Sequence, residues 1–396
     1  ILEHADLCPD GVPLLAKFEK LSLIKRVPVG EHSRFRMPVP IRSYCRDQRD
    51  QGARAELRRR AVWAALSIAT HIEAQYEGED PSPSLQMFLA EQDLLLGAVS
   101  LSQQESLCAE SGAGILWRVR SVTISAGMPH RWAELVLDHP CRNSGQFPAD
   151  VRARAGIVAG LFLSNLQDSF AARTLIAETI SETWSRVNGE HKARLANAHA
   201  YSVLTIPATK VAPKEVEAVL SMLVEARAEL KAEQGGSTAS INRLRLAMEA
   251  NEASLLRLLR RHDEAIAIIE SILERAPVDR FNRAYPTLWL AVADNQMDLG
   301  RRAEARNAAR RALQAAEVAK QPVAALLSQL TLVGFALDER DLGEAVNWLS
   351  CWLESEQNSS CRQFATPLTM LSATLQLSEH EDLALETYRL ARRTGL

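Results

Sequence analysis

The sequence contains few aromatic residues and no long apolar run. Aromatic residues make up 5% of its 396 residues, although 47% of the chain is hydrophobic. A membrane-spanning helix needs about 20 apolar residues in succession. The longest apolar run, Gly156 to Leu163, is far shorter and fits the buried face of a helix. The sequence therefore indicates no membrane-spanning helix.

Two motifs of metal and nucleotide chemistry are also absent. No glycine is followed by lysine, so the phosphate-binding loop G-x-x-x-x-G-K-[ST] is missing. The cysteines form no C-x-x-C pair, and none stands beside a histidine at zinc-ligand spacing. We interpret them as reduced thiols of a cytoplasmic protein, and we expect no cofactor and no metal ion in this chain. They are Cys8, Cys45, Cys108, Cys141, Cys351 and Cys361.

Charge is unevenly distributed along the chain. The whole chain carries a net charge of -3, whereas residues 1–60 hold 13 Lys and Arg against 8 Asp and Glu. Such a basic end can contact nucleic acid or an acidic partner, and more commonly it only solvates a surface. The chain begins at Ile1 and not at Met. We expect that further sequence precedes it.

An alanine that follows a glutamate recurs every forty residues, at Ala265, Ala305 and Ala345. A fixed period of this length is typical of a solenoid built from helical hairpins. The small residue has a physical reason, because two antiparallel helices that cross at about 8–10 Å leave room only for a small side chain. We extend the series in both directions to Ala133, Ala172, Ala218 and Ala384.

The first fifty residues have a different pattern. The stripe of Leu14, Leu15, Phe18 and Leu21 predicts a helix, and two short extended segments then flank Gly30. A second helix follows Pro40. We therefore predict an all-α chain: a TPR-like α-solenoid of stacked helical hairpins, preceded by a small partial winged-helix domain with a two-stranded wing. The predicted boundaries are 1–52 for the winged helix, 53–112 for linking helices and 113–396 for the repeat array.

The repeats resemble tetratricopeptide (TPR) hairpins. In residues 286–317 the large, small, turn, small and small positions of that motif are occupied, in this order, by Trp289, Ala293, Gly300, Ala305 and Ala312. The resemblance implies that the first helix of each hairpin faces a concave groove. The groove positions that it implies are Ser254, Arg257, Thr287, Asp294, Leu330 and Leu337. The leucines either bind an apolar peptide or are covered by the next hairpin.

The N-terminal segment resembles the winged helix that follows the nucleotide-binding core of STAND-class ATPases, the NB-ARC and regulator-type group of signal-transduction proteins. The residues that fit that pattern are Leu21, Ser22, Leu23, Arg34, Arg36, Ile41, Arg42 and Tyr44. A later helix is similar through Glu91, Asp93, Leu95 and Ala98, while Leu94 and Leu96 replace the usual Asn and Arg.

This resemblance implies a non-enzymatic sensor arm of a cytoplasmic signalling protein. A protein, a peptide or a small ligand would bind the repeats, and the winged helix would relay binding to an upstream core that holds ATP or ADP or drives self-oligomerisation. Arg34, Arg36 and Arg42 are the candidate relay residues. The alternative is a transcriptional regulator whose winged helix contacts DNA through the same arginines. A cryptic enzyme is the lesser alternative.

Two groups of residues with possible chemistry need an interpretation. His191 and His199 lie eight residues apart on a predicted helix, and we interpret them as surface or capping residues because no third metal ligand is evident. Asp138, His139 and Cys141 contain the residue types of a nucleophile dyad, but they lie in a predicted loop with no oxyanion donor.

Overall fold

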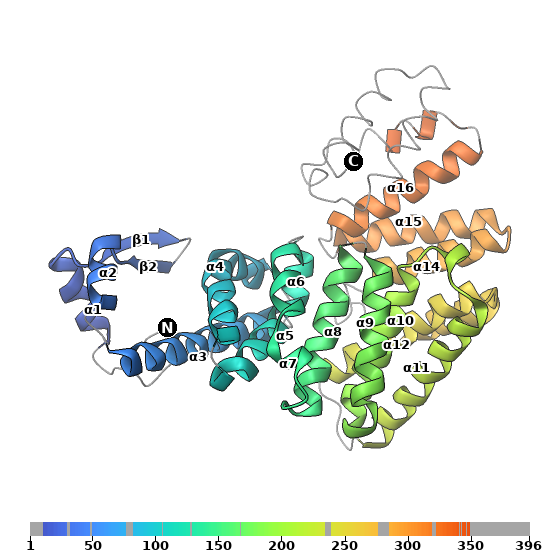
Figure 1. Cartoon of the computed structure of the whole chain (residues 1–396). Helices are drawn as coiled ribbons and strands as arrows, with labels where there is room; N and C mark the ends of the chain where they lie inside the picture. Colours follow the sequence, from blue (N-terminus) through green and yellow to red (C-terminus); the bar gives the residue numbers. More distant parts are fainter. Residues whose placement is uncertain are drawn as a thin grey trace. The chain divides into compact units, whose positions relative to one another are not determined.

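The structure is a computed structural model in which nearly every regular element is a helix. A helix, a two-stranded hairpin and a second helix come first, and helices follow from residue 51 onward (Figure 1). The residues that it describes are 11–29, 32–47, 50–76, 82–104, 106–126, 129–166, 168–233, 239–275, 285–318, 322–339, 341, 343–345 and 347–348.

The N-terminal segment has the predicted order of elements. Helix α1 (Gly11–Lys20) precedes strands β1 (Lys25–Val29) and β2 (His32–Arg36), and α2 (Val39–Asp47) follows. The strands pair antiparallel, with Lys25 opposite Arg36. Pro40 falls in the first turn of α2, where a missing N–H costs no helical hydrogen bond. The two short strands that the sequence predicts around Gly30 therefore pair as a hairpin.

The chain divides into two compact units, residues 1–206 and 207–396. The remaining helices of the first unit, called unit 1, are α3 (Gln51–Tyr76), α4 (Ser82–Gln104), α5 (Ala109–Ser125), α6 (Pro129–Leu137), α7 (Pro140–Asn143), α8 (Ala149–Asn165), α9 (Ser169–Thr183) and α10 (Gly189–Leu204), with short 3-10 turns at Ser106–Cys108 and Trp184–Arg186.

Helices of unit 1 pack as successive antiparallel pairs. Helix α3 packs on α4, and α8 packs on α9, while α5 bridges α3 and α8. The largest fully buried side chains are aromatic: Trp132, Phe88 and Phe162. The rings of Phe88 and Trp132 lie 5.8 Å apart between centroids. Few aromatic residues therefore occupy the centre, and aliphatic side chains fill the rest of this core.

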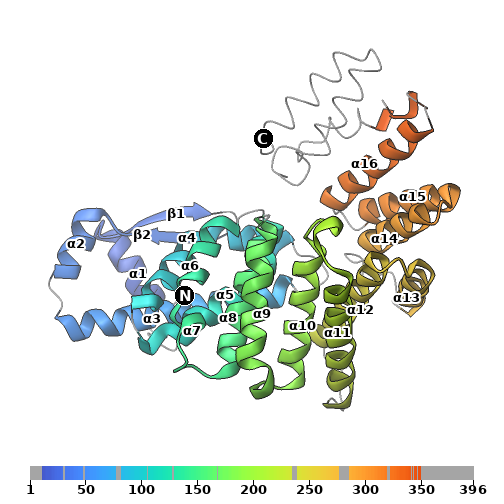
Figure 2. The same ribbon diagram turned by 45° about the vertical axis from the view of Figure 1, so that its right-hand side comes forward.

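Two glycines set the distance between α8 and α9, which lie side by side in Figures 1 and 2. A methyl group added to Gly156 would lie 2.3 Å from Oγ1 and 2.9 Å from Cβ of Thr179. At Gly160 it would lie 2.4 Å from Cδ1 of Ile176. Because protein interiors are close-packed and the Cβ of Thr179 is fixed by the backbone of α9, a methyl at Gly156 would require the helices to shift. The run Gly156 to Leu163 is buried, as predicted, except for the half-buried Leu161, and its glycines are packing residues.

We expect Gly156→Ala to lower the free energy of unfolding by about 1–3 kcal/mol, because overpacking forces α8 and α9 apart. The matched control is Gly97→Ala in α4, where nothing lies within 4 Å of the added methyl. That control should be neutral or stabilising by up to about 1 kcal/mol. Urea unfolding followed by circular dichroism measures both, and equal midpoints for the two variants would contradict this account.

The second unit, called unit 2, continues the hairpins. Its helices are α11 (Pro213–Glu233), α12 (Ala239–Leu258), α13 (His262–Arg275), α14 (Tyr285–Asp298), α15 (Arg302–Val318) and α16 (Pro322–Asp338), with a 3-10 turn at Ala208–Lys210. Each helix packs on the next along the chain. The predicted fold class, an α-solenoid of TPR-like stacked hairpins, is confirmed.

The forty-residue period is visible in the backbone as well as in the alanines. Arg260 and Gly300 are forty residues apart, and both adopt positive φ, 59° and 75°, after the first helix of a hairpin. The left-handed conformation ends the helix there, and it suits glycine better than arginine. The prediction that Gly300 forms the turn of its hairpin is confirmed.

Most of the alanine series lies at helix crossings. Ala133, Ala172, Ala265, Ala305 and Ala345 are all buried. Ala218 is exposed, so its place in the series was wrong. The buried stripe of α11 instead runs through Val216, Val219, Leu223 and Ala226, and this stripe turns Ala218 outward. Ala384 lies outside the described residues.

Candidate ligand-binding side of the first helices

The predicted groove residues of unit 2 lie on the first helices of three hairpins. Ser254 and Arg257 are on α12, Thr287 and Asp294 on α14, and Leu330 and Leu337 on α16. Of these six, the structure brings together Arg257 and Asp294, whose Nη1 and Oδ2 atoms are 2.8 Å apart. Arg257 also donates through Nε to Asp298, 2.7 Å away, which the sequence analysis missed.

The other four predicted positions lie outside this ion cluster. Ser254 donates its hydroxyl to the carbonyl of Ala250, one turn earlier, at 3.0 Å. Thr287 is exposed and Leu330 is half-buried. Leu337 belongs to α16, but its side chain lies outside the described residues.

The carboxylates of Asp294 and Asp298 share the guanidinium group of Arg257. The side chains of Arg257, Asp294 and Asp298 are 37%, 48% and 40% exposed. Burial raises the pKa of Asp294, and the Asp298 charge adds to that effect, while Arg257 opposes it. His262 lies 3.1 Å from Oδ1 of the buried Asn295 and 4.0 Å from Asp298. A half-exposed ion cluster thus joins two successive hairpins with one negative charge in excess.

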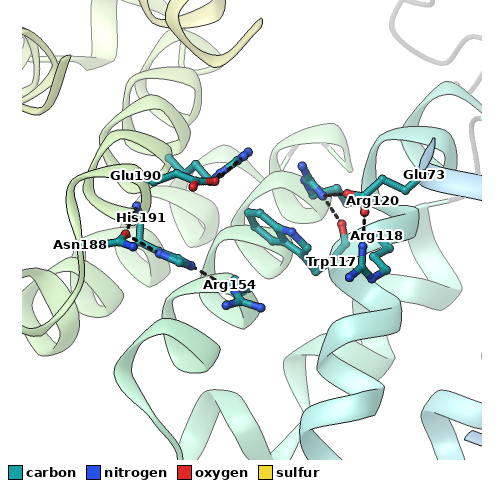
Figure 3. A network of polar contacts seen from close by, with 9 residues as sticks. Glu73, Trp117, Arg118, Arg120, Arg154, Asn188, Glu190 and His191 are labelled. Atoms are coloured by element: carbon teal, nitrogen blue, oxygen red, sulfur yellow. Dashed lines mark hydrogen bonds and ion pairs between the residues drawn. The ribbon is translucent and has the colours of Figure 1, made fainter. Parts of the chain in front are cut away.

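A second set of polar side chains gathers in unit 1, on α3, α5, α8 and α10 (Figure 3). At its centre is Trp117 of α5. The Arg120 guanidinium lies 3.9 Å from the centroid of its ring, and that of Arg194, from α10, lies 5.3 Å from it. Glu73 of α3 pairs with Arg118 at 2.5 Å and with Arg120 at 3.4 Å. Four helices therefore contribute to one network.

His191 extends this network between α8 and α10. Its Nδ1 lies 2.8 Å from Oδ1 of Asn188, the N-cap of α10, and its Nε2 accepts the Nε–H of Arg154 at 3.1 Å. An arginine only donates, so Nε2 is unprotonated and the proton sits on Nδ1. Burial, followed by the Arg154 charge, lowers the pKa of His191. This histidine is a neutral connector.

The sequence analysis missed this network. Two features of the sequence could have indicated the network. Trp117 and Arg120 are three residues apart and so share one helix face, and Asn188 stands at an N-cap position. His191 and His199, which the sequence analysis interprets as surface or capping residues, are both half-buried, and the N-cap is Asn188, whose side chain accepts the backbone N–H of His191. Among the described residues, no three His, Cys, Asp or Glu side chains converge as a metal site.

The candidate nucleophile pair has a structural role. His139 is fully buried, and its Nδ1 accepts the backbone N–H of Cys141 at 3.3 Å, which caps α7. The proton is therefore on Nε2, which lies 3.4 Å from Oγ of Ser102, and that hydroxyl donates to the carbonyl of Val99. Burial raises the pKa of Cys141 to about 12, so its thiol stays protonated at neutral pH. This geometry does not activate a nucleophile.

Burial lowers the pKa of His139 to about 4. An unfolded histidine titrates near pH ~6.5. Between these values the unfolded state binds the extra proton, so stability is lost as the pH falls from about 6.5 to about 4, by at most about 1.4 kcal/mol per pH unit. His139→Asn keeps an oxygen cap for α7 and cannot titrate. We expect its stability to fall less steeply in this window than that of the wild type. Parallel curves from urea unfolding at each pH would contradict the assignment.

The remaining candidates lie elsewhere. Arg34 and Arg36 belong to β2 and Arg42 to α2, and their side chains are outside the described residues. A groove of about 430 Å³ in unit 2 does not coincide with the Arg257 cluster. Helices α11, α12 and α13 form it, and its lining is Arg227, Glu249, Ala267, Ile268, Ser271 and Arg275.

No helix among the described residues is long and apolar enough to cross a bilayer.

No protein-family model matches the chain, and no curated protein matches it. Among solved structures it is similar to a Rap protein complexed with Competence and Sporulation Factor, with 15% identity, 84% of this chain and 97% of that chain covered, and a TM-score of 0.53. The apo form of RapI is 11% identical, the match covers 86% of this chain and 97% of RapI, and the TM-score is 0.44. The apo quorum sensor NprR from B. thuringiensis has 12% identity, 84% and 97% coverage and a TM-score of 0.46. At such identities the likeness to the Rap complex shows the fold alone: a TPR-like solenoid of stacked helices.

Proposed function

We propose that this chain is a sensor arm, which binds a protein or peptide ligand on the side formed by the first helices of its hairpins. The observation that carries the proposal is the Arg257–Asp294–Asp298 cluster, because it joins first helices of successive hairpins and keeps half-exposed charges there. A stack of hairpins presents such side chains as one continuous surface. The Rap protein, which shares the fold, was solved with a bound factor.

The charged groups of this cluster can contribute more free energy to ligand binding than to folding. Exposed ion pairs contribute only about 0–1 kcal/mol to folding. Charged hydrogen bonds to a docked partner are stronger, at about 1.5–3 kcal/mol. Arg257 and its carboxylates therefore act in recognition, with small consequences for the fold.

We expect Arg257→Ala to weaken ligand binding about tenfold or more while changing the free energy of unfolding by less than about 1 kcal/mol. Ligands are selected with the full chain from a random heptapeptide array, and affinities are measured by fluorescence anisotropy. Arg301→Ala is the matched control, because Arg301 pairs with Asp263 across neighbouring hairpins at the turns. An array that retains no peptide, or equal losses in both variants, would refute the proposal.

The finer proposal is that binding is relayed through α1, the β1–β2 hairpin and α2 to an upstream nucleotide-binding core of the STAND class. The helix–hairpin–helix order expected from that resemblance supports it. A ligand that binds two conformations of the arm with different affinity would bias the attached core. ATP or ADP would then belong to that core.

The relay is tested with the protein encoded by the complete gene. Ligand should change either nucleotide exchange or the mass measured by light scattering. Replacing Arg34, Arg36 and Arg42 by Ala should abolish this response and leave ligand affinity within about twofold, because coupling and binding are separate free energies. An upstream sequence without a nucleotide-binding motif would end this part of the proposal, and salt-dependent DNA binding lost in the triple variant would favour the regulator alternative.

A further inference from the structure

We infer that the groove formed by α11, α12 and α13 in unit 2 holds one uncharged, aliphatic side chain of the peptide ligand. The inference rests on the proposed function and names the class of ligand residue that this groove takes. Its volume of about 430 Å³ is that of a small ligand site, since such sites occupy about 300–1,000 Å³. The groove lies within one unit, and α12 also carries Arg257.

The first argument is the apolar part of the groove. Ala267 and Ile268 of α13 line it, and the first is exposed while the second is half-buried. On α11, Val224 comes three residues before Arg227 and so shares that face of the helix, where it is 41% exposed. An aliphatic ligand side chain would remove this apolar surface from water, which is favourable in proportion to the area covered.

The second argument is that the charged groups at the groove balance one another. Glu249 of α12 pairs with Arg275 of α13 at 2.8 Å and with Arg227 of α11 at 3.7 Å. Arg227 also pairs with Glu252 at 2.5 Å. Two guanidinium groups therefore face two carboxylates, and these four groups have no net charge for a ligand to neutralise.

A charged ligand group would disturb this balance. Glu249 and Glu252 are only 13% and 11% exposed. Burial raises the pKa of Glu252, Arg227 opposes that effect, and the Glu249 charge adds to it. A further carboxylate would add repulsion, and a ligand cation would compete with Arg227 or Arg275 for a carboxylate and leave a guanidinium without its partner. An uncharged occupant avoids both costs.

Arg275 can hold the peptide backbone beside this side chain. It is 57% exposed, its Nε donates to the carbonyl of Ser271 at 2.9 Å, and its Nη2 donates to Glu249 at 2.8 Å. A guanidinium group has five N–H donors, so these contacts leave Nη1 available to a peptide carbonyl. Such an acceptor is neutral and keeps the charges of the groove balanced.

The test uses the full chain and a heptapeptide that the array retains. Each aliphatic residue of the peptide is replaced in turn by Ala, Lys and Glu, and affinities are measured by fluorescence anisotropy. At one position all three replacements should weaken binding about tenfold or more, because buried apolar area is lost and neither charge finds a partner. A peptide in which every aliphatic position accepts Lys or Glu without loss would overturn the inference.

Variants connect that position to the groove. Ala267→Trp fills the groove from an exposed site, so it should weaken the parent peptide about tenfold or more. It should also reduce the effect of the peptide's Ala replacement to within about twofold, because groups in contact are energetically coupled.

Asn307→Trp is the matched control. Asn307 is exposed on α15, forty residues after Ala267, and does not line the groove. The control should leave peptide affinity within about twofold, and thermal melts establish that each variant folds. If Ala267→Trp does not fold, Ser271→Phe, one turn further along α13, fills the groove instead.

The outcomes separate the two proposals. Peptides that depend on Arg257 but bind the groove-filling variant with unchanged affinity would overturn this inference and leave the proposed function standing. Peptides that depend on the groove and bind Arg257→Ala equally well would support the inference and count against the Arg257 cluster as the binding surface. An array with no bound peptide would refute both.

Discussion

Close approach of antiparallel helices is the constraint on which the rest of the structure depends. It requires a small residue at each crossing, and the fully buried Ala265 and Ala305 meet that requirement in unit 2. In unit 1, Gly156 and Gly160 allow α9 to contact the backbone of α8. With few aromatic side chains to fill space, stability comes from many short aliphatic contacts, and these contacts weaken quickly when helices separate.

The same constraint leaves the charged residues at the surface of the first helices. Because the small and aliphatic residues occupy the crossings, long polar side chains lie beside them and can reach counterparts on the next hairpin. Arg257 meets Asp294 and Asp298 in this way, and Arg154 meets His191. The clusters are thus a consequence of stacking, and the one at Arg257 carries two carboxylates for one guanidinium.

His139 and Cys141 show that residue types common in catalytic sites can have a purely structural role between stacked helices. In sequence, His139 and Cys141 have the composition of a nucleophile pair. In the fold, the imidazole accepts the N–H of Cys141 and caps a short helix, and the thiol is too strongly buried to ionise. Spacing along a chain cannot distinguish these roles, because the ring nitrogen that carries the proton is chosen by its tertiary neighbours.

The sequence by itself determined the helical hairpins, their forty-residue period, the turn at Gly300 and the helix–hairpin–helix order of the first fifty residues, since all of these depend on local conformation and on the spacing of small and apolar residues. The resemblance of the repeats to tetratricopeptide hairpins was enough to place Arg257 and Asp294 on the first helices of adjacent hairpins. Only the tertiary structure decided that Ala218 is exposed, because the buried stripe sets the rotation of α11. It alone brought Trp117 and Arg194 together from α5 and α10, because contacts between distant segments depend on how helices stack and leave no periodic signal in the chain.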